Sequence, residues 1–457
     1  MKKKDEIILE IADVKFPNKA YGYFEGEQVV VKNAIPGQKV QAQVCKKRSS
    51  GVEARLQEVV ERSPLERTEG MCSHYELCGG CNYQPLRHEE ELKLKERQVK
   101  RLLEAANIEV GSWEGIVPAP SETGYRNKCE FSFGDEEKDG ALALGMRKRM
   151  SHYEVVTLKD CNIIDGDFLK IIEGTLAFFT ERKVPFYHKA RHDGTLRHLV
   201  VRKGAATGEV LVNLVTSSDV PFSAEEYKEM LLNLPLTGSL CGILHTINDG
   251  LADAVKSDEM HLLYGREYFM EKLFDLEFKV SVYSFFQTNS EGAEKLYSIV
   301  KEFAGDVENK MVFDLYCGTG TIGQIMAQAG SKKVVGIELI EEAVVAANEN
   351  AKRNHLENCT FIAGDVLKMV DELEDKPDLI IVDPPRDGIH PKAIGKIIDF
   401  GAPEIVYVSC KPTSLARDLE VFRQNGYRVD RVKLMDMFPR TVHVETVCLL
   451  SRENQHS

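Results

Sequence analysis

Two short apolar runs late in the chain end at side chains that can do chemistry. Ile380-Ile-Val runs into Asp383-Pro-Pro-Arg, and Val406-Tyr-Val runs into Ser409-Cys410. A carboxylate accepts a hydrogen bond from an N–H group such as N3 of uracil, and an ionised cysteine is a nucleophile. Reactive groups of α/β proteins gather where strands end, so both motifs are candidates for a reaction centre.

The reaction that suits these groups is methylation of a pyrimidine. Carbon 5 of the ring is a poor nucleophile, but addition of a thiolate to carbon 6 makes it enolate-like and able to attack a methyl sulfonium. A base must then remove the carbon-5 proton so that the thiol can leave. We expect Cys410 to supply the thiolate, helped by the neighbouring cation Lys411. The candidate base is Glu445, with His443 as its rival and a structural polar pair at a strand edge as the alternative.

A glycine-rich turn upstream is a candidate site for the methyl donor. Asp314-Leu-Tyr-Cys leads into Gly318-Thr-Gly320, where the missing side chains let the backbone approach a ligand at a helix start. Glu338 follows the next apolar run and can accept hydrogen bonds from both ribose hydroxyls, while Asp365 is a candidate partner of an adenine amino group. Asp314 suits the ammonium of an amino-acid moiety and repels a pyrophosphate. The pattern favours S-adenosylmethionine, with another nucleotide as the alternative.

The segments around these motifs predict a doubly wound parallel sheet. From about residue 290 onward, apolar strands alternate with helical stretches, and strands are expected from Lys310, Lys332, Asp378 and Glu404. Such a sheet binds ligands beyond the carboxyl ends of its strands. We therefore expect an α/β protein in which residues 291–457 form a Rossmann-like class I methyltransferase domain.

Two further regions precede this domain. Residues 1–62 predict a small β-barrel and carry twelve Lys and Arg against nine Asp and Glu, although the whole chain has a net charge of -13. A small basic barrel is a common nucleic-acid platform, and an ordinary solvated surface is the alternative. Residues 63–290 predict a mixed α/β domain with a charged helix from His88. Its basic run from His188 to Lys203 is either a solvated face or a track for phosphates.

Taken in order, the motifs resemble those of the RNA uracil-5 methyltransferases of the TrmA/RumA type. The resemblance covers nearly the whole chain. It rests on Ser284-Phe-Phe-Gln-Thr-Asn, Asp314-Leu-Tyr-Cys-Gly-Thr-Gly, Asp383-Pro-Pro-Arg, Ser409-Cys and Phe438-Pro-Arg-Thr-Val-His-Val-Glu. It implies that Cys410 is the nucleophile and Glu445 the proton acceptor. The cofactor-site positions that it implies are Gln287, Tyr316, Glu338 and Asp383, to which the chemistry above adds Asp365.

The N-terminal block also resembles a known domain, and two positions depart from the family pattern. With Pro36-Gly-Gln-Lys-Val it looks like a TRAM domain, an RNA-binding β-barrel. Lys411 stands where the family often has Asn, and Arg440 stands where His or Gln is common. Neither change removes a reacting group.

Three of the eleven cysteines crowd into Cys72-Ser-His-Tyr-Glu-Leu-Cys-Gly-Gly-Cys. Thiolates suit an iron-sulfur cubane or zinc, and the spacing does not match a zinc ribbon. In rRNA-type members of the family this motif and a distant cysteine hold a structural [4Fe-4S] cluster; a structural zinc is the alternative. The pattern alone does not separate Cys129 or Cys45 from the distant position. The ligands that the resemblance implies are Cys72, Cys78, Cys81 and Cys161.

We therefore expect an enzyme that methylates carbon 5 of a uridine in 23S rRNA. The cysteine motif and the TRAM-like block favour rRNA over tRNA; a tRNA substrate, a cytosine target and a non-catalytic RNA assembly factor are the alternatives. No apolar run approaches the ~18 residues of a spanning helix. Acidic residues interrupt the basic N-terminus, so that an export signal is not expected. We expect a cytoplasmic monomer with no membrane partner.

Overall fold

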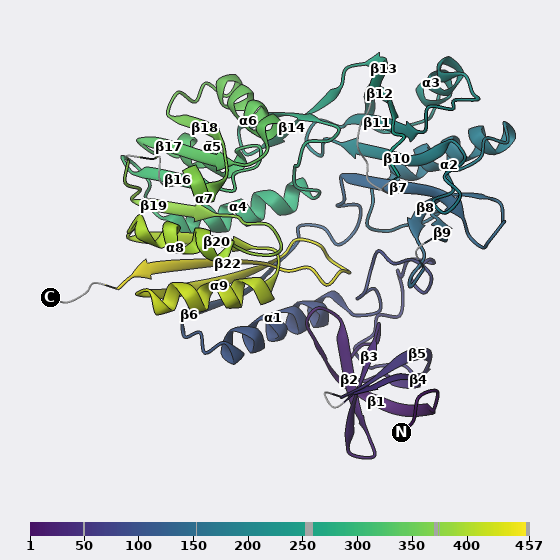
Figure 1. Cartoon of the computed structure of the whole chain (residues 1–457), viewed down its shortest axis with the longest axis horizontal. Coiled ribbons are helices and arrows are strands. Elements are labelled where there is room, and N and C mark those ends of the chain that lie inside the picture. Colours follow the sequence, from purple (N-terminus) through teal and green to yellow (C-terminus); the bar gives the residue numbers. More distant parts are fainter. Residues whose placement is uncertain (49–50, 152, 252–258, 370–372, 374, 454–457) are drawn as a thin grey trace.

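The structure is a computed structural model of the chain, and it describes residues 1–48, 51–151, 153–251, 259–369, 373 and 375–453. Three large β-structures follow one another along this part of the chain: a barrel, a seven-stranded sheet and an eight-stranded sheet (Figure 1). The N-terminus lies on the barrel, and β22, the last strand of the chain, belongs to the eight-stranded sheet (Figure 1).

The first five strands close into the barrel. They are β1 (Glu6–Lys15), β2 (Lys19–Phe24), β3 (Glu27–Lys32), β4 (Lys39–Arg48) and β5 (Gly51–Glu61). Along β1 the buried residues Ile7, Leu9 and Ile11 alternate with exposed ones, so one face of the strand lines the interior. The order is β1-β2-β3-β5-β4, and β4 pairs back to β1.

The central part of the chain forms the seven-stranded sheet. Its strands are β7 (Lys128–Asp135), β8 (Leu142–Arg147), β9 (Val155–Thr157), β10 (Leu196–Lys203), β11 (Glu209–Thr216), β12 (Ser239–Ile247) and β13 (Glu259–Gly265), in the order β13-β12-β11-β10-β7-β8-β9. Helices α2 (Gly166–Glu181) and α3 (Ala224–Leu232) cover one face, where Phe168 packs edge-on against Phe131. The hairpin of β14 (Tyr268–Leu273) and β15 (Leu276–Ser281) leads on to the C-terminal part.

The eight-stranded sheet carries the predicted nucleotide motifs. Its strands are β6 (Val110–Pro118), β16 (Met311–Leu315), β17 (Lys333–Glu338), β18 (Cys359–Ala363), β19 (Leu379–Val382), β20 (Glu404–Ser409), β21 (Tyr427–Asp436) and β22 (Glu445–Arg452). The order is β18-β17-β16-β19-β20-β22-β21-β6, with β18 to β20 parallel and β22 antiparallel to both neighbours. The strand order reverses at β16, and this switch point is where such sheets bind ligands.

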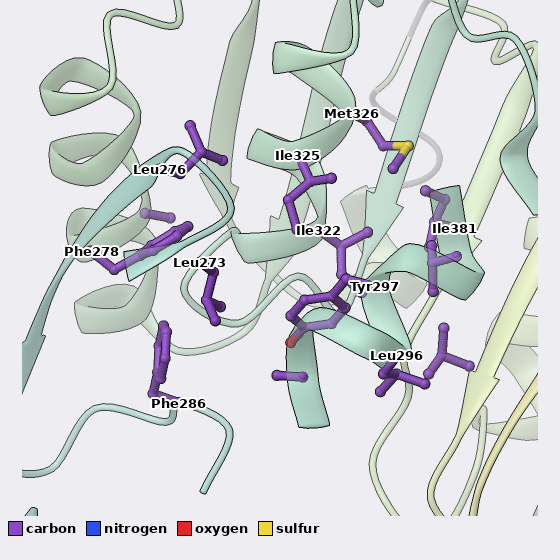
Figure 2. Packing of buried hydrophobic residues seen from close by; sticks show 14 of the residues in the cluster. Leu273, Leu276, Phe278, Phe286, Leu296, Tyr297, Ile322, Ile325, Met326 and Ile381 are labelled. Carbon is purple, nitrogen blue, oxygen red and sulfur yellow. The ribbon is translucent and has the colours of Figure 1, made fainter. Parts of the chain in front are cut away.

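Helices cover both faces of this sheet, which explains why its strands are continuously apolar. One face holds α4 (Ser290–Ala304), α5 (Thr321–Gln328) and α6 (Glu341–Arg353), and the other holds α1 (His88–Ala105), α8 (Pro391–Asp399) and α9 (Pro412–Gln424). The short α7 (Val366–Met369) follows β18. Within β19, Ile381 faces the first group and Ile380 the second. Figure 2 shows Ile381 with Leu296 and Tyr297 of α4 and Ile322 of α5 in the first core.

Two elements of the eight-stranded sheet layer come from well upstream in the chain. Strand β6 pairs in parallel with β21, placing Trp113 opposite Val432, and α1 buries Val99 and Leu103 in the core beneath α9. Both segments fall within residues 63–290, which were predicted to form the central domain. The division at residues 62 and 290 stays a prediction.

The fold class is confirmed: the protein is mixed α/β, with an N-terminal five-stranded barrel and a C-terminal doubly wound sheet. The strands expected from Lys310, Lys332, Asp378 and Glu404 correspond to β16, β17, β19 and β20. All eleven cysteines are free thiols. In the part of the chain that the structure describes, no helix is long and apolar enough to cross a membrane.

Candidate active site

The glycine-rich turn lies directly after β16, at the switch point of the sheet. Gly318 and Gly320 have φ values of 52° and 72°, which favour glycine, and Gly320 opens helix α5. A Cβ on Gly320 would lie 2.6 Å from the ring of Phe361. The turn therefore needs glycine there both for its conformation and for its contact with β18.

Asp314 lies beneath this turn and has an oxygen without a partner. Its Oδ2 accepts a hydrogen bond from the Gly323 amide at 2.7 Å, but its Oδ1 is buried and unbonded. Burial, opposed by the Gly323 bond and aided by Asp383 and Glu338, raises the pKa of Asp314 to about 8. A buried carboxylate that faces a cavity and lacks a donor fits the ammonium of an amino-acid moiety.

Two further carboxylates at the cavity are held by backbone amides. Glu338, at the end of β17, accepts from the amides of Gly318 at 3.1 Å and Ile340 at 2.9 Å. Asp365, after β18, accepts from the Leu367 amide at 3.0 Å. These bonds fix both carboxylates while leaving each lone pairs for a ligand.

Cys410 and Glu445 are neighbours because of the strand register. In the antiparallel pair of β20 and β22, Ser409 lies opposite Thr446, so Cys410 falls beside Glu445. Glu445 is 5% exposed and Cys410 is half-buried. Both line a cavity of about 1110 Å³ that also exposes Asp314. Every predicted catalytic and cofactor residue lines this cavity: Gln287, Tyr316, Glu338, Asp365, Asp383, Cys410 and Glu445.

Burial raises the pKa values of Cys410, Glu445 and Asp383 in the ligand-free protein. Burial, aided by the charges of Glu445 and Asp383, raises the pKa of Cys410 to about 11. Burial and Asp383 raise the pKa of Glu445 to about 8, and burial raises that of Asp383 to about 7. A cation that entered the cavity would lower all three pKa values.

The cation that acts on the thiol is Arg386, which closes the Asp383-Pro-Pro-Arg motif. Arg386 lowers the pKa of both Cys410 and Glu445 and lines the cavity. The predicted helper, Lys411, points elsewhere, since its Nζ lies 3.7 Å from Asp387. Arg386 is part of a motif that the sequence alone singles out. Only the fold shows that it, and not Lys411, is the basic residue that acts on the sulfur of Cys410.

His443 also lines the cavity, on the side of Arg386. Its two ring nitrogens each lie 3.5 Å from Nη2 of Arg386. Burial, Arg386 and two more distant cations lower its pKa to about 4, so it is neutral at physiological pH. A neutral histidine held next to an arginine is a weaker base than the ionised form of Glu445.

Several side chains of the basic run of the central part point into the protein, among them Arg202 and Lys203. Arg202 is buried and donates to three carbonyls of the 281–284 loop, at 2.7 to 3.2 Å. Lys203 pairs with Asp165 at 2.9 Å and Asp167 at 2.8 Å. The loop that Arg202 holds leads to Gln287, which hydrogen-bonds to the hydroxyl of Tyr297. Arg202 therefore shapes the cofactor end of the cavity, a role that the sequence pattern did not reveal.

The cysteine-rich segment docks on two distant parts of the chain. Arg149 donates to the carbonyls of Tyr75 at 3.0 Å and Cys81 at 2.7 Å, and the Ser73 hydroxyl donates to Asp160 at 2.8 Å. This docking brings Cys161, next to Asp160, to the segment.

The four predicted ligand thiols interact with one another. Cys72 and Cys161 hydrogen-bond, and this bond together with burial raises the pKa of Cys161. Burial, with a smaller effect from charge on Cys72, raises the pKa of Cys78 and Cys81. Within the described residues, no group of three or more His, Cys, Asp or Glu closes around a single ion. The thiols are thus near each other without forming an ion-sized site.

A doubly wound sheet with a glycine-rich turn at its switch point, over a cavity lined by acids, defines an S-adenosylmethionine-dependent methyltransferase. Comparisons with known proteins show to which family of methyltransferases the chain belongs. The family model described as tRNA (Uracil-5-)-methyltransferase matches residues 254–453. Uncharacterized RNA methyltransferases of Clostridium tetani and Clostridium acetobutylicum are 48% and 50% identical to the chain, each over 99% of both proteins.

A solved structure agrees with these relatives. The crystal structure of Pyrococcus abyssi tRNA (uracil-54, C5)-methyltransferase in complex with S-adenosyl-L-homocysteine is 28% identical, with a TM-score of 0.77 over 97% of this chain and 100% of that one. The chain belongs to the TrmA/RumA-type family of RNA uracil-5 methyltransferases, as its motifs predict. It is an enzyme that uses S-adenosylmethionine and acts on RNA.

Proposed function

We propose that this enzyme methylates carbon 5 of a uridine in 23S rRNA through a covalent bond between Cys410 and carbon 6. The observation that carries the proposal is the strand register that sets Cys410 beside the buried Glu445, in the cavity that also exposes Asp314. The thiol and the proton acceptor must act on adjacent carbons of one ring, and neighbouring strand ends provide that proximity.

The chain's own groups account for each step. The Cys410 thiolate adds to carbon 6, and the ring electrons move toward O4, where Asp383 is placed to interact with the neighbouring N3–H. S-adenosylmethionine supplies the methyl group as a sulfonium, and carbon 5 takes that methyl group. Glu445 then removes the carbon-5 proton, the double bond re-forms and the thiolate leaves. The positive charge of the sulfonium favours the ionised forms of Cys410 and Glu445.

The cofactor is proposed to lie along the carboxyl ends of β16 to β19. Asp314 would receive the ammonium, Glu338 the ribose hydroxyls and Asp365 the adenine amino group. The remaining cofactor residues proposed are Gln287, Tyr316 and Asp383.

We also propose that Cys72, Cys78, Cys81 and Cys161 hold a [4Fe-4S] cluster. Their thiols interact, yet no ion-sized group exists among the described residues. A cubane is larger than one ion and separates its ligands more widely than zinc, whose Zn–S bonds are about 2.3 Å. When bound, the cluster would cross-link the 72–81 segment to Cys161 and would supply no step of methyl transfer.

The barrel is proposed to be a TRAM domain that binds RNA, and the protein to work in the cytoplasm. Residues 1–62 are net positive within an acidic chain, which suits contact with phosphates. The proposal of 23S rRNA rests on the resemblance of the cysteine motif to that of rRNA-type members, and the likeness to a tRNA (uracil-54, C5)-methyltransferase over 97% of this chain keeps tRNA as the alternative.

The reaction is tested with RNA that contains 5-fluorouridine, because fluorine cannot leave carbon 5 as a proton. We expect a denaturation-resistant complex between RNA and protein that depends on S-adenosylmethionine. Cys410→Ala should abolish it, whereas Cys317→Ala, which alters another cavity thiol, should retain it. A complex that forms equally well with Cys410→Ala would refute the proposed nucleophile.

The substrate is tested by mapping 5-methyluridine in cells that lack the protein. We expect a methyl group to disappear from 23S rRNA and to return when the wild-type gene is restored, but not with Cys410→Ala. Loss of the methyl group from tRNA instead would make the tRNA alternative correct, and loss of 5-methylcytidine would assign a different pyrimidine.

A further inference from the structure

The loop between β21 and β22, residues 437–444, positions both sides of the reaction centre. Phe438 and His443 line the cavity, and Glu445 follows immediately at the start of β22. The position of the proton acceptor therefore depends on how this loop is held.

The backbone of the loop is bonded at three successive carbonyls. The Phe438 carbonyl accepts from Lys95 at 3.4 Å, and the Pro439 carbonyl accepts from the Tyr125 hydroxyl at 2.8 Å. The Arg440 carbonyl accepts from the amides of residues 82 and 83, at 2.9 and 3.0 Å, directly after Cys81. Partners from three other segments thus determine the path of the loop.

Arg440 is at the centre of these contacts. Its backbone φ is 71°, a conformation that costs a residue other than glycine about 1 kcal/mol or more. Its amide donates to Glu91 at 2.8 Å, and its guanidinium donates to the Leu86 carbonyl at 3.1 Å, to Glu91 at 3.4 Å and to Glu122. Arg440 is 2% exposed, and the carboxylates of Glu91 and Glu122 compensate its charge.

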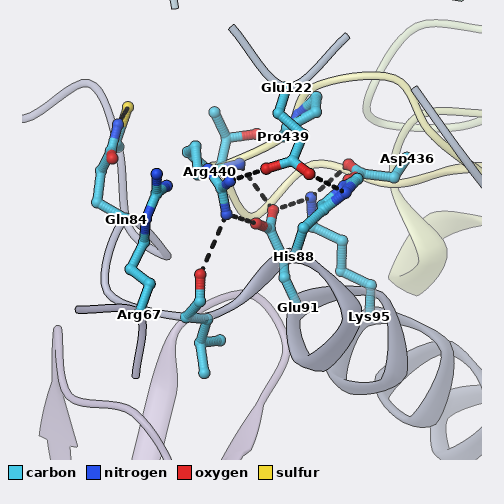
Figure 3. Close-up of polar contacts among 12 residues, drawn as sticks. Arg67, Gln84, His88, Glu91, Lys95, Glu122, Asp436, Pro439 and Arg440 are labelled. Atoms are coloured by element: carbon cyan, nitrogen blue, oxygen red, sulfur yellow. Dashed lines mark hydrogen bonds and ion pairs between the residues drawn. The ribbon is translucent and has the colours of Figure 1, made fainter. Parts of the chain in front are cut away.

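Glu91 lies on helix α1, in a row with two other charged residues of the network. His88, Glu91 and Lys95 are spaced by three and four residues, so they lie in a row along the helix. Lys95 bonds to Glu91 at 2.8 Å and to Asp436 at 2.6 Å, and His88 bonds to Asp436 at 2.8 Å. Figure 3 shows the side chains of Arg440 and Lys95 meeting at the carboxylate of Glu91. Charges on the loop and on the helix therefore form one buried network.

We propose that Arg440 is a positioning residue that aims Glu445 at the carbon-5 proton of the covalent intermediate. The inference rests on the proposed function and goes beyond it. Arg440 lies in the network and not in the cavity lining, so it acts through the loop and not on substrate. A buried arginine with a strained backbone, held by a carboxylate and two amides, persists because the surroundings determine its conformation.

The role predicts a specific defect. A loosened loop displaces Glu445, while Cys410 stays in place because it lies in the short turn between β20, which ends at Ser409, and α9, which begins at Pro412. Attack on carbon 6 and methyl transfer therefore proceed, but proton removal slows and the methylated RNA stays bound to sulfur. A displacement of about 1 Å costs on the order of 100-fold in such a step.

The test uses Arg440→Lys, which keeps the charge but cannot reproduce the forked contacts. We expect this variant to accumulate a denaturation-resistant complex with ordinary uridine RNA, and to release tritium from carbon-5-labelled RNA about 10- to 100-fold more slowly than wild type. Trapping by 5-fluorouridine RNA and the KM for S-adenosylmethionine should be unchanged. Glu122→Ala removes the half-exposed carboxylate that Arg440 shares with His88, leaves Glu91 in place, and should show the same defect in milder form.

The matched control is Arg431→Lys, which lies on β21 and pairs with Glu114 and Glu302 outside the site. It should behave as wild type. Normal tritium release in both Arg440→Lys and Glu122→Ala would overturn the positioning role, as would an equal loss of trapping and release. If wild-type protein itself fails to trap 5-fluorouridine RNA, the proposed function fails, independently of Arg440.

Discussion

At the scale of single residues, the active cavity is defined by acids that are costly to ionise. Asp314, Asp383 and Glu445 all have raised pKa values because burial disfavours negative charge, and neighbouring carboxylates add to this effect at Asp314 and Glu445. Such groups destabilise the empty protein and gain partners only when a cationic ligand binds. This is the electrostatic reason that the cavity suits a sulfonium and an ammonium.

The pH dependence of methyl transfer should reveal which cation acts on the thiol. The working forms of Cys410 and Glu445 are the deprotonated ones, so the single-turnover rate should rise from about pH 6 to about pH 9. Arg386→Gln removes the cation that lowers both pKa values, and it should move the profile to higher pH. Lys411→Met, which removes the partner of Asp387, should leave the profile in place. A shift of the profile in Lys411→Met but not in Arg386→Gln would mean that Lys411 is the cation that lowers the pKa of Cys410.

Asp314→Asn should raise the stability of the ligand-free protein and lower its affinity for the cofactor. The folded-state pKa of Asp314 is about 8 against an ordinary 3.8, so the folded form holds a proton that the unfolded form releases between these values. Stability therefore falls as pH rises through this window, and asparagine avoids that loss. At neutral pH the variant should melt at a higher temperature without ligand, yet bind S-adenosylhomocysteine at least about tenfold more weakly.

Thermal melting and calorimetric titration measure the two effects of Asp314→Asn. Asp399→Asn, at an exposed position on α8, is the control and should change neither. Unchanged affinity in Asp314→Asn would mean that Asp314 does not receive the ammonium.

At the scale of elements, the site depends on strand ends and on the turns that follow them. The turn after β16 takes positive φ values at Gly318 and Gly320, and the register of β20 with β22 sets Cys410 beside Glu445. Because these features belong to the backbone, adding a side chain at either glycine should distort the turn and weaken binding of the cofactor.

Gly320→Ala should destabilise the protein by about 1–3 kcal/mol and weaken S-adenosylhomocysteine binding, since its Cβ would lie 2.6 Å from Phe361 and its φ is 72°. Gly395→Ala is a matched control in α8, where a Cβ meets nothing within 4 Å. It should stabilise the helix by about 0.5–1 kcal/mol and leave binding unchanged. Urea unfolding measures both; equal effects of the two changes would contradict the turn geometry.

At the scale of the whole molecule, helix α1 joins the barrel to the catalytic sheet. On the barrel side, Arg97 pairs with Asp13 at 2.8 Å and Gln98 donates to the Val14 carbonyl at 3.0 Å. On the other side, Lys95 and Glu91 hold the catalytic loop. A helix with contacts on both sides fixes the barrel relative to the active cavity.

The cysteine segment makes a second long-range connection, and metal analysis tests it. After anaerobic purification we expect iron and sulfide in wild type and in Cys129→Ala, whose parent thiol is buried in β7. Cys161→Ser should lose most of the iron and melt at a lower temperature, because the cluster stabilises only the folded form. Stoichiometric zinc without iron would refute the cluster and support a structural zinc site.

What the sequence by itself determined about this protein was local. The strand patterns, the glycine-rich turn and the motifs at strand ends each follow from neighbouring residues, and they were enough to predict the α/β class and the residues that line the cavity. The order of the motifs also identified the family, because the types of the reacting residues and their spacing can be read directly from the sequence.

Only the tertiary structure decided which distant groups meet. It paired β6 with β21, turned Arg202 inward to the 281–284 loop, chose Arg386 over Lys411 as the cation near the sulfur and brought Cys161 to Cys72. In the sequence, Arg440 was only a residue that differs from the family pattern; in the structure it lies at the centre of a buried network. These outcomes depend on strand order and packing between remote segments, and local periodicity carries no information about such pairings.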